Sequence, residues 1–207
     1  MKQLTVETFK AMLGNALRRV KEREDEFSKL DAVIGDGDHG TAIVTALTVA
    51  VKAATAEGNE LKAVLNDIGF GIMLETSGST STLLGAFFLG MGDHAAETVP
   101  DAAGVKAMFA GGLANIRLQT KAKQGDKTMM DVLIPAVEAM NACSSDDIGD
   151  ILQVGADAAL QGAKATIDMQ ARFGRARNYG ERSIGHADSG AVSWSCLFAA
   201  FAEAAKN

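Results

Sequence analysis

The sequence is poor in residue types that characterise several other protein classes. Its 207 residues include two cysteines and two prolines, and aromatic residues make up 5%. Cys143 and Cys196 lie far apart, and no secretory leader is recognisable before them. This argues against a disulfide framework or a Cys-x-x-Cys metal site. The low proline and aromatic content favours an α-rich chain over a β-sandwich.

Long hydrophobic runs and excess positive charge are also missing. No stretch of about 18 apolar residues is present, which argues against a membrane span. The 20 Lys and Arg residues are outnumbered by 26 Asp and Glu residues, and the net charge is −6. Bulk binding to nucleic acid needs clustered positive charge. We therefore expect a cytoplasmic protein with no nucleic-acid partner and no membrane partner.

Apolar residues recur at helical spacing along most of the chain. The first helix begins after a capping Thr5, and its apolar residues include Val6, Phe9 and Leu13. Further helices are predicted near residues 41–56, 61–74, 83–98, 102–121, 127–143, 148–165 and 191–206, with no convincing strand pattern. Short loops make sequential helices pack antiparallel. We expect a single all-α domain, residues 1–207, built as an antiparallel bundle of about eight helices.

Glycines gather in four polar loops between these apolar helices. The loops span residues 35–40, 76–81, 125–128 and 174–190. Functional residues are often carried by loops on a rigid scaffold. Because antiparallel helices place alternate loops at the same end of a bundle, we expect the four loops to converge on one ligand.

Three aspartates, Asp31, Asp36 and Asp38, lie within a span of eight residues at the first polar loop. Clustered carboxylates raise one another's pKa, and a divalent cation relieves this repulsion by taking oxygen ligands. Oxygen donors indicate Mg²⁺, Mn²⁺ or Ca²⁺ rather than zinc. The alternative is a helix-capping loop, since Asp and Gly are common in turns. We favour metal ligation by the three aspartates.

His39 follows this cluster directly and leaves three interpretations open. It could be a fourth metal ligand, a hydrogen-bond donor to a phosphate, or an exposed loop histidine. We favour the phosphate donor, because one imidazole among three carboxylates is an unusual ligand set.

Two further segments have chemistry suited to phosphate, although neither the P-loop nor the Gly-x-Gly-x-x-Gly spacing occurs. Residues 77–81, Ser-Gly-Ser-Thr-Ser, precede an apolar helix, whose N-terminus can bind an anion. Residues 172–182 contain four arginines, which bind phosphate bidentately and could order as a lid. The alternatives are an ordinary N-cap and a solvated loop with ion pairs. Together with the aspartates, these segments predict a nucleotide phosphate site suited to phosphoryl transfer.

Three motifs resemble the nucleotide-binding L subunit of dihydroxyacetone kinase. They are D-x-x-I-G-D-G-D-H-G at residues 31–40, Gly-Asp-Lys-Thr-Met at 125–129, and the long run from Met169 to Gly190. The resemblance implies an antiparallel eight-helix barrel holding ADP or ATP and two Mg²⁺ ions at one end. It implies Mg²⁺ ligation by Asp31, Asp36 and Asp38. The residues implied to line the nucleotide are His39, Gly40, Thr41, Ala42, Ser79, Thr80, Met129, Arg175, Asp188, Ser189 and Gly190.

The same resemblance implies a kinase subunit that works with a partner. A separate K subunit would hold a short ketose, and Arg175 would act on the transferring phosphoryl group. The donor would be free ATP, or bound ADP recharged by a phosphocarrier protein of the sugar phosphotransferase system. We expect a homodimer or a heteromer.

The chain departs from the family pattern in two loops. Residues 77–81 have more hydroxyls and fewer glycines than usual, and Ser189 stands where proline is usual. The ketose therefore stays open between dihydroxyacetone and a tetrulose such as erythrulose. The alternative function is a nucleotide-state sensor that binds a transcription regulator without productive catalysis.

Overall fold

The computed structural model of the chain describes residues 1–54, 60–96 and 98–206. These residues form α-helices and two 3-10 helices, with no strand among them. The α-helices are α1 Val6–Glu22, α2 Glu24–Ile34, α3 His39–Ala53, α4 Leu61–Glu75, α5 Ser79–Asp93, α6 Ala102–Gln119, α7 Met130–Ala142, α8 Ile148–Ala165 and α9 Ser189–Ala204. The 3-10 helices are η1 Thr166–Asp168 and η2 Arg175–Ser183. The all-α prediction is confirmed.

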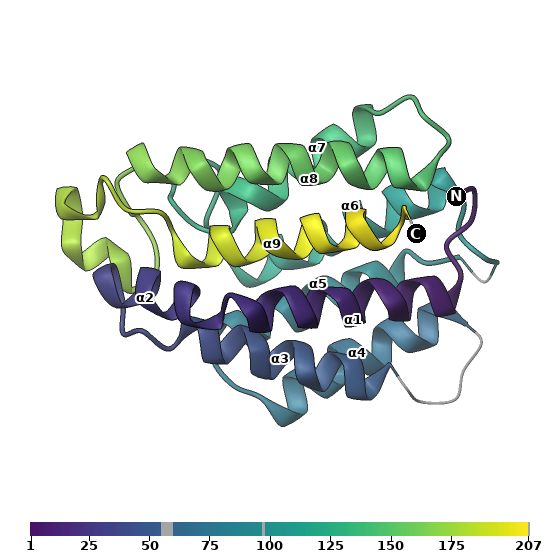
Figure 1. Cartoon of the computed structure of the whole chain (residues 1–207), viewed down its shortest axis with the longest axis horizontal. Coiled ribbons are helices and arrows are strands. Elements are labelled where there is room, and N and C mark those ends of the chain that lie inside the picture. The colour runs from purple at the N-terminus through teal and green to yellow at the C-terminus, as the bar shows by residue number, and fades with distance from the viewer. Residues whose placement is uncertain (55–59, 97, 207) are drawn as a thin grey trace.

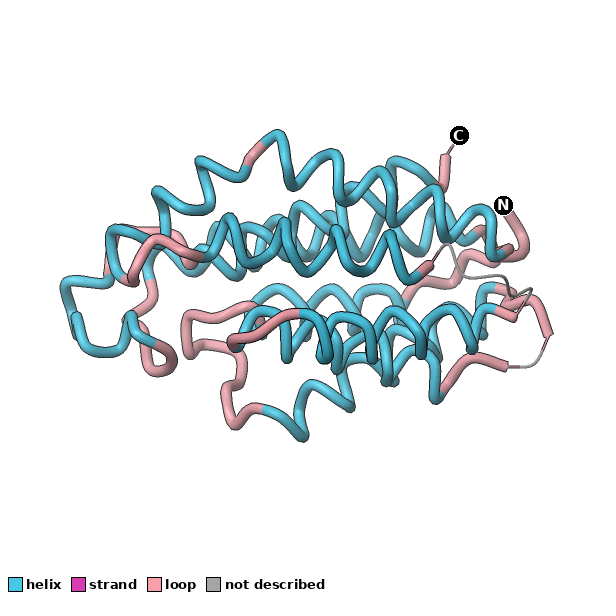
Figure 2. The backbone as a smooth tube through the Cα atoms, turned by 90° about the horizontal axis from the view of Figure 1, so that it is seen from below, coloured by secondary structure: helices cyan, strands magenta, loops and turns pink. Residues whose placement is uncertain are grey.

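Eight of the helices close into an antiparallel ring. Helix α1 packs against α3, and each helix from α3 to α8 packs against the next one in the chain. Helix α9 packs against α1 and completes the circle. Figure 2 shows the long helices running side by side, with connections at the two ends. The short α2 adds a ninth helix outside this ring, beside α3 and α9.

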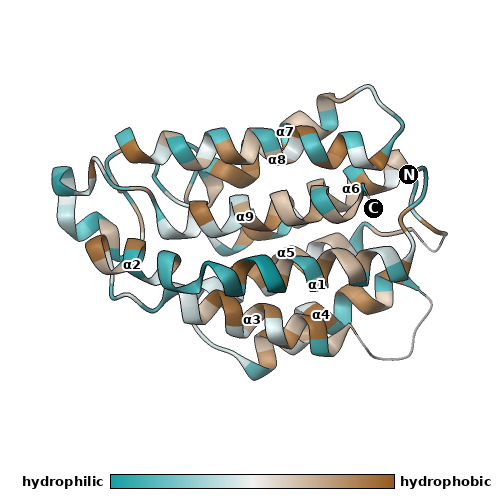
Figure 3. Ribbon diagram, in the orientation of Figure 1, coloured by the Kyte–Doolittle hydropathy of each residue, from teal (hydrophilic) through white to brown (hydrophobic). Residues whose placement is uncertain are grey.

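Aromatic side chains fill the interior of the ring. Phe87 packs edge-on against Phe88, Phe109 and Trp194, with ring centroids 5.2 to 5.8 Å apart. Burying a phenylalanine of this kind contributes about 1.5–3 kcal/mol. Figure 3 shows the complementary pattern on α1, whose polar side faces outward. The few aromatic residues are thus concentrated where they stabilise the centre of the fold.

The helix boundaries differ from those predicted in two informative places. The predicted set lacked α2, which begins after a break at Arg23, the C-cap of α1. Helix α5 begins at Ser79 rather than Leu83, because the hydroxyl residues form its first turn. The predicted end of another helix, at Ala56, lies outside the described residues. No helix among those described has the length and apolar character required to cross a membrane.

Chain direction gives the two ends of the bundle different chemistry. Helices α3, α5, α7 and α9 begin at the end where α2, α4, α6 and α8 finish. Both chain termini lie at the opposite end. Four helix N-termini, each with a positive partial charge, therefore surround one end of the bundle.

Candidate functional site

A pocket of about 460 Å³ opens at the end where these four helices begin. Residues from all four glycine-rich loops line it, so the predicted convergence of the loops is confirmed. This volume lies within the usual range for small-molecule sites. The predicted site residues that line it are Asp31, Asp36, Asp38, His39, Ala42, Ser79, Thr80, Met129, Arg175, Asp188, Ser189 and Gly190.

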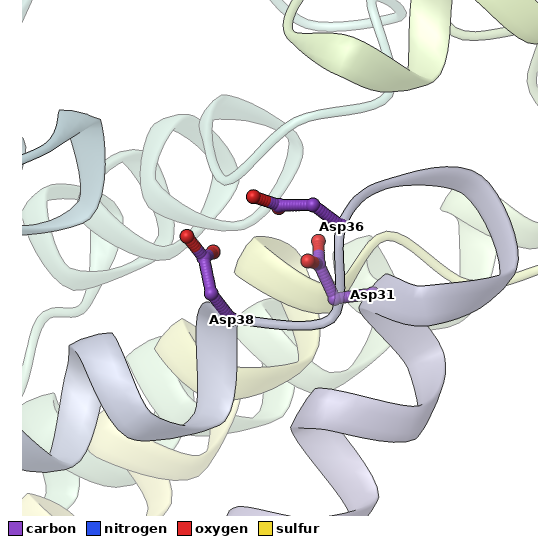
Figure 4. Close-up of side chains that lie close together, drawn as sticks. All are labelled: Asp31, Asp36 and Asp38. Carbon is purple, nitrogen blue, oxygen red and sulfur yellow. The ribbon is translucent and has the colours of Figure 1, made fainter.

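Asp31 lies in the last turn of α2, and Asp36 and Asp38 lie on the connection to α3, with the three carboxylates turned toward a common region (Figure 4). One ligand oxygen from each lies within 4.8 Å of the others. Asp31 is the most firmly held: the Gly37 N–H donates to its Oδ2 at 2.8 Å, and the Ser189 hydroxyl donates to its Oδ1 at 3.0 Å. The arrangement has the all-oxygen donor set and the spacing of a hard divalent cation site.

Arg175 partly balances the charge of this cluster. Its guanidinium pairs with the Asp36 carboxylate and lies 4.0 Å from that of Asp38. The other two carboxylates receive no such close guanidinium contact in the ion pairs of the described residues. Positive charge at this position is therefore favourable, and a divalent ion would supply more of it than Arg175 does.

Close contact between α2 and α3 holds the aspartate loop in place. A Cβ atom on Gly40 would lie 2.2 Å from the Glu24 carbonyl oxygen, so only glycine allows this approach. The Thr41 hydroxyl donates to the Glu24 carboxylate at 3.1 Å. Gly40 and Thr41 thus face α2 and do not line the pocket, unlike their neighbours His39 and Ala42.

His39 joins three helices at the pocket wall. Its Nδ1 lies 3.2 Å from the Thr80 hydroxyl on α5, and its Nε2 lies 2.8 Å from the Ser193 hydroxyl on α9. Burial lowers the pKa of the imidazole, and the charges of Asp31 and Asp38 oppose the shift. The side chain is 8% exposed and lies outside the aspartate cluster, so it is neither an exposed loop histidine nor grouped with the candidate ligands.

The N-terminus of α5 forms another part of the wall. Gly78 adopts φ +92°, a left-handed conformation that favours glycine, and no side chain caps the helix after it. Ser79 and Thr80 follow directly and line the pocket. Backbone N–H groups at such a helix start can bind an anion.

The arginine-rich segment contributes one of its four arginines to the lining, Arg175. Arg182 instead stacks over Tyr179, 5.6 Å from the ring centroid. Six residues after this segment, the Asp188 carboxylate caps α9 by accepting from the Ala191 N–H at 2.7 Å. Burial raises the pKa of Asp188 to about 7. The chain is therefore held at two places, at the pocket through Arg175 and at the start of α9 through Asp188.

Several lining residues are absent from the predicted site. The apolar ones are Ile34, Leu83, Ala122, Met130, Phe173, Ala176 and Trp194, and polar ones include Thr120, Lys127 and Thr128. Trp194 could have been found, because it lies four residues after Gly190 and so on the same face of α9. The others depend on tertiary packing between distant segments.

Comparison with known proteins gives a consistent group of relatives. The ADP-binding subunit DhaL of PEP-dependent dihydroxyacetone kinase 1 from Listeria innocua is 38% identical over 181 residues, covering 87% of each chain. The corresponding DhaL subunit from Escherichia coli is 34% identical over 186 residues, covering 86% of this chain and 87% of that protein. D-erythrulose kinase from Mycolicibacterium smegmatis is 36% identical over 182 residues, which are 83% of this chain but 31% of that protein.

A solved structure shows the same architecture. The dihydroxyacetone kinase of C. freundii, in complex with AMP-PNP and Mg²⁺, superposes with a TM-score of 0.75 at 25% identity. The match covers 98% of this chain and 34% of that enzyme, so the chain corresponds to about a third of the longer kinase. The sequence profile described as the DAK2 domain matches residues 33–203. With most of its length matched in this way, the chain belongs to the DAK2 domain family.

Proposed function

We propose that the chain is the nucleotide-binding subunit of a dihydroxyacetone-type kinase. The observation that carries the proposal is one pocket that combines three clustered carboxylates, an uncapped helix N-terminus and an arginine. Phosphoryl transfer depends on such groups, because the protein contributes mainly by positioning the phosphates and stabilising their charge. ADP or ATP is the proposed ligand, as the names of the DhaL relatives and the nucleotide complex of C. freundii support.

In this proposal Asp31, Asp36 and Asp38 hold two Mg²⁺ ions. Bound there, the ions would bridge the phosphates and neutralise charge on the transferring group. The chain's own residues bind and orient the nucleotide. The N–H groups at the start of α5 bind phosphate oxygens, and Arg175 moves from Asp36 to the phosphates as metal replaces it at the carboxylate.

The acceptor is proposed to be a short ketose held by a separate K subunit. Relatives of similar length are named as subunits of PEP-dependent kinases, which supports a multisubunit enzyme in which a phosphocarrier recharges bound ADP. The erythrulose kinases among the relatives keep a tetrulose open as the substrate beside dihydroxyacetone.

The test combines the purified chain with a ketose-binding K subunit of a related kinase, a ketose and Mg-ATP. A parallel reaction contains ADP, the phosphocarrier proteins and phosphoenolpyruvate in place of ATP. Formation of ketose phosphate in either reaction, and its loss with Asp36→Ala, is expected. Tight nucleotide binding with no product in either reaction would contradict the kinase and favour a nucleotide-state sensor.

A further inference from the structure

Lys127 is a buried cation whose part in the site the proposed mechanism leaves unassigned. Its side chain is 1% exposed although it borders the pocket. Its backbone adopts φ +60°, and among the non-glycine residues that the structure describes it alone has a positive φ. A lysine in a glycine-containing loop beside a phosphate site would ordinarily be expected to contact phosphate.

The ammonium group of Lys127 is directed elsewhere. Its Nζ donates to the carbonyl oxygens of Thr166 at 2.6 Å and Met169 at 3.1 Å, and also to that of His186. An ammonium has three N–H donors, so these three acceptors use all of them. All three belong to the segment 166–186, which carries Arg175 and leads into Asp188.

These contacts join the two ends of the segment. Thr166 and Met169 lie at its beginning, and His186 lies at its end. The Gly185 N–H also donates to the Ile167 carbonyl at 2.8 Å, and the Asp188 N–H donates to the Thr166 hydroxyl at 3.1 Å. Lys127 therefore lies at the closed base of a long loop whose tip includes η2.

The turn that carries Lys127 is itself held firmly. The Asp131 carboxylate accepts from the backbone N–H groups of Gly125 and Thr128. The Asp126 carbonyl accepts from the Arg172 N–H at 3.1 Å, which attaches the turn to the loop a second time. The lysine thus reaches the loop from a fixed platform at the start of α7.

Replacing this lysine would remove one donor from three buried or partly buried carbonyls, of which that of Thr166 would keep the Met169 N–H at 3.2 Å. A carbonyl left without a donor in such a place is costly, so the base of the loop would be expected to open to water. Burial lowers the pKa of the Lys127 ammonium, and the charges of Asp188, Asp168 and Asp131 oppose this shift.

The geometry points to Lys127 as a positioning residue, which holds the base of the segment 166–186 closed and so places Arg175 and Ser189 on the pocket. The inference rests on the proposed nucleotide function and deepens it. Lys127 acts through the loop and touches no phosphate.

The test uses Lys127→Met, which keeps the length of the side chain but removes its donors and charge. The control is Lys121→Met, an exposed lysine six residues earlier. Hydrogen exchange of the nucleotide-free proteins is expected to rise in residues 170–187 for Lys127→Met, with α1 to α6 unchanged. The affinity for Mg-ADP is expected to fall at least about tenfold, as for a lost charge-assisted contact.

A double-mutant cycle separates positioning from a general structural role. In an Arg175→Ala background, Lys127→Met is expected to weaken Mg-ADP less than about threefold, because the residue acts largely through Arg175. Wild-type exchange in the loop together with wild-type ADP affinity would overturn the inference. So would a full tenfold loss in the Arg175→Ala background.

Failure of the proposed function would look different. If the wild-type chain binds no nucleotide, the proposed function fails. Faster hydrogen exchange confined to the loop in Lys127→Met would still support the positioning role of Lys127. If Lys127→Met does not fold, the wild-type protein decides by NMR. A slowly exchanging ammonium signal with contacts to residues 166–186 supports the inference, and a freely exchanging one overturns it.

Discussion

The change Asp36→Ala is expected to separate metal binding from folding. The side chain of Asp36 is 41% exposed, and its ion pair joins it to Arg175, which is 63% exposed. An exposed pair of this kind contributes about 0–1 kcal/mol to stability. The free energy of unfolding, measured in urea, is therefore expected to change by less than about 1 kcal/mol, with the helical circular dichroism unchanged.

Nucleotide binding is expected to respond much more strongly. The change removes one of three anionic ligands from a site whose oxygens lie within 4.8 Å of one another. We expect the Mg²⁺-dependent affinity for ADP to fall at least about 100-fold, which corresponds to about 2.7 kcal/mol. Isothermal titration calorimetry with Mg²⁺ and with a chelator measures this difference directly.

Two companion variants sharpen the comparison. Asp67→Ala removes the same charge from an exposed position on α4 and should leave binding unchanged. Asp31→Ala should lose metal binding and also about 1–3 kcal/mol of stability, because the Gly37 N–H and the Ser189 hydroxyl lose their acceptor. If Asp36→Ala binds Mg-ADP within threefold of the wild type, the assignment of the metal site is wrong.

Three further changes test other parts of the structure. Arg175→Ala should weaken Mg-ADP more than about tenfold yet strengthen binding of Mg²⁺ alone, because the guanidinium no longer occupies Asp36; calorimetry in which both affinities move together would contradict this. The pKa of Asp188 is raised from 3.8 to about 7, so the nucleotide-free protein should lose on the order of 4 kcal/mol of unfolding free energy between pH 4 and pH 7, since the folded state binds the extra proton. Asp188→Asn, which keeps the helix cap, should flatten that slope in urea titrations at pH 5 and pH 7.5. Phe109→Ala should cost about 3–5 kcal/mol by leaving a cavity beside Phe87, and a loss below about 1 kcal/mol would refute the packing argument.

The architecture could be predicted because each long helix has its own apolar repeat. Helix α2 was not predicted, although its sequence carries an apolar repeat. Its apolar residues Phe27, Leu30 and Ile34 recur at steps of three and four, but no capping side chain precedes them. The residues on both sides of Arg23 are charged and suit a helix, so the sequence gives no sign that α1 ends and α2 begins there.

The site divides in the same way between local and distant information. The aspartate cluster and the hydroxyl-rich turn are contiguous in sequence, so their chemistry could be recognised there. The contact of His39 with Ser193 could not be predicted, because Ser193 is 154 residues away and approaches only when the ring closes. Lys127 is a stronger case: its loop lacks the P-loop spacing and predicts no role for the lysine, and only the packed structure reveals its three backbone acceptors.

Charge balance supports the proposal that dications help this site to hold a nucleotide. Four helix N-termini contribute about half a positive charge each, or about +2, and Arg175 adds one more. Against these stand three carboxylates and about three negative charges on ADP, since a terminal phosphate carries nearly two at neutral pH. The two proposed Mg²⁺ ions would cover this shortfall of about three charges, whereas one ion would not. The N-termini alone can therefore attract phosphate but cannot hold it beside the aspartates, and ADP is expected to bind weakly whenever a chelator removes the metal.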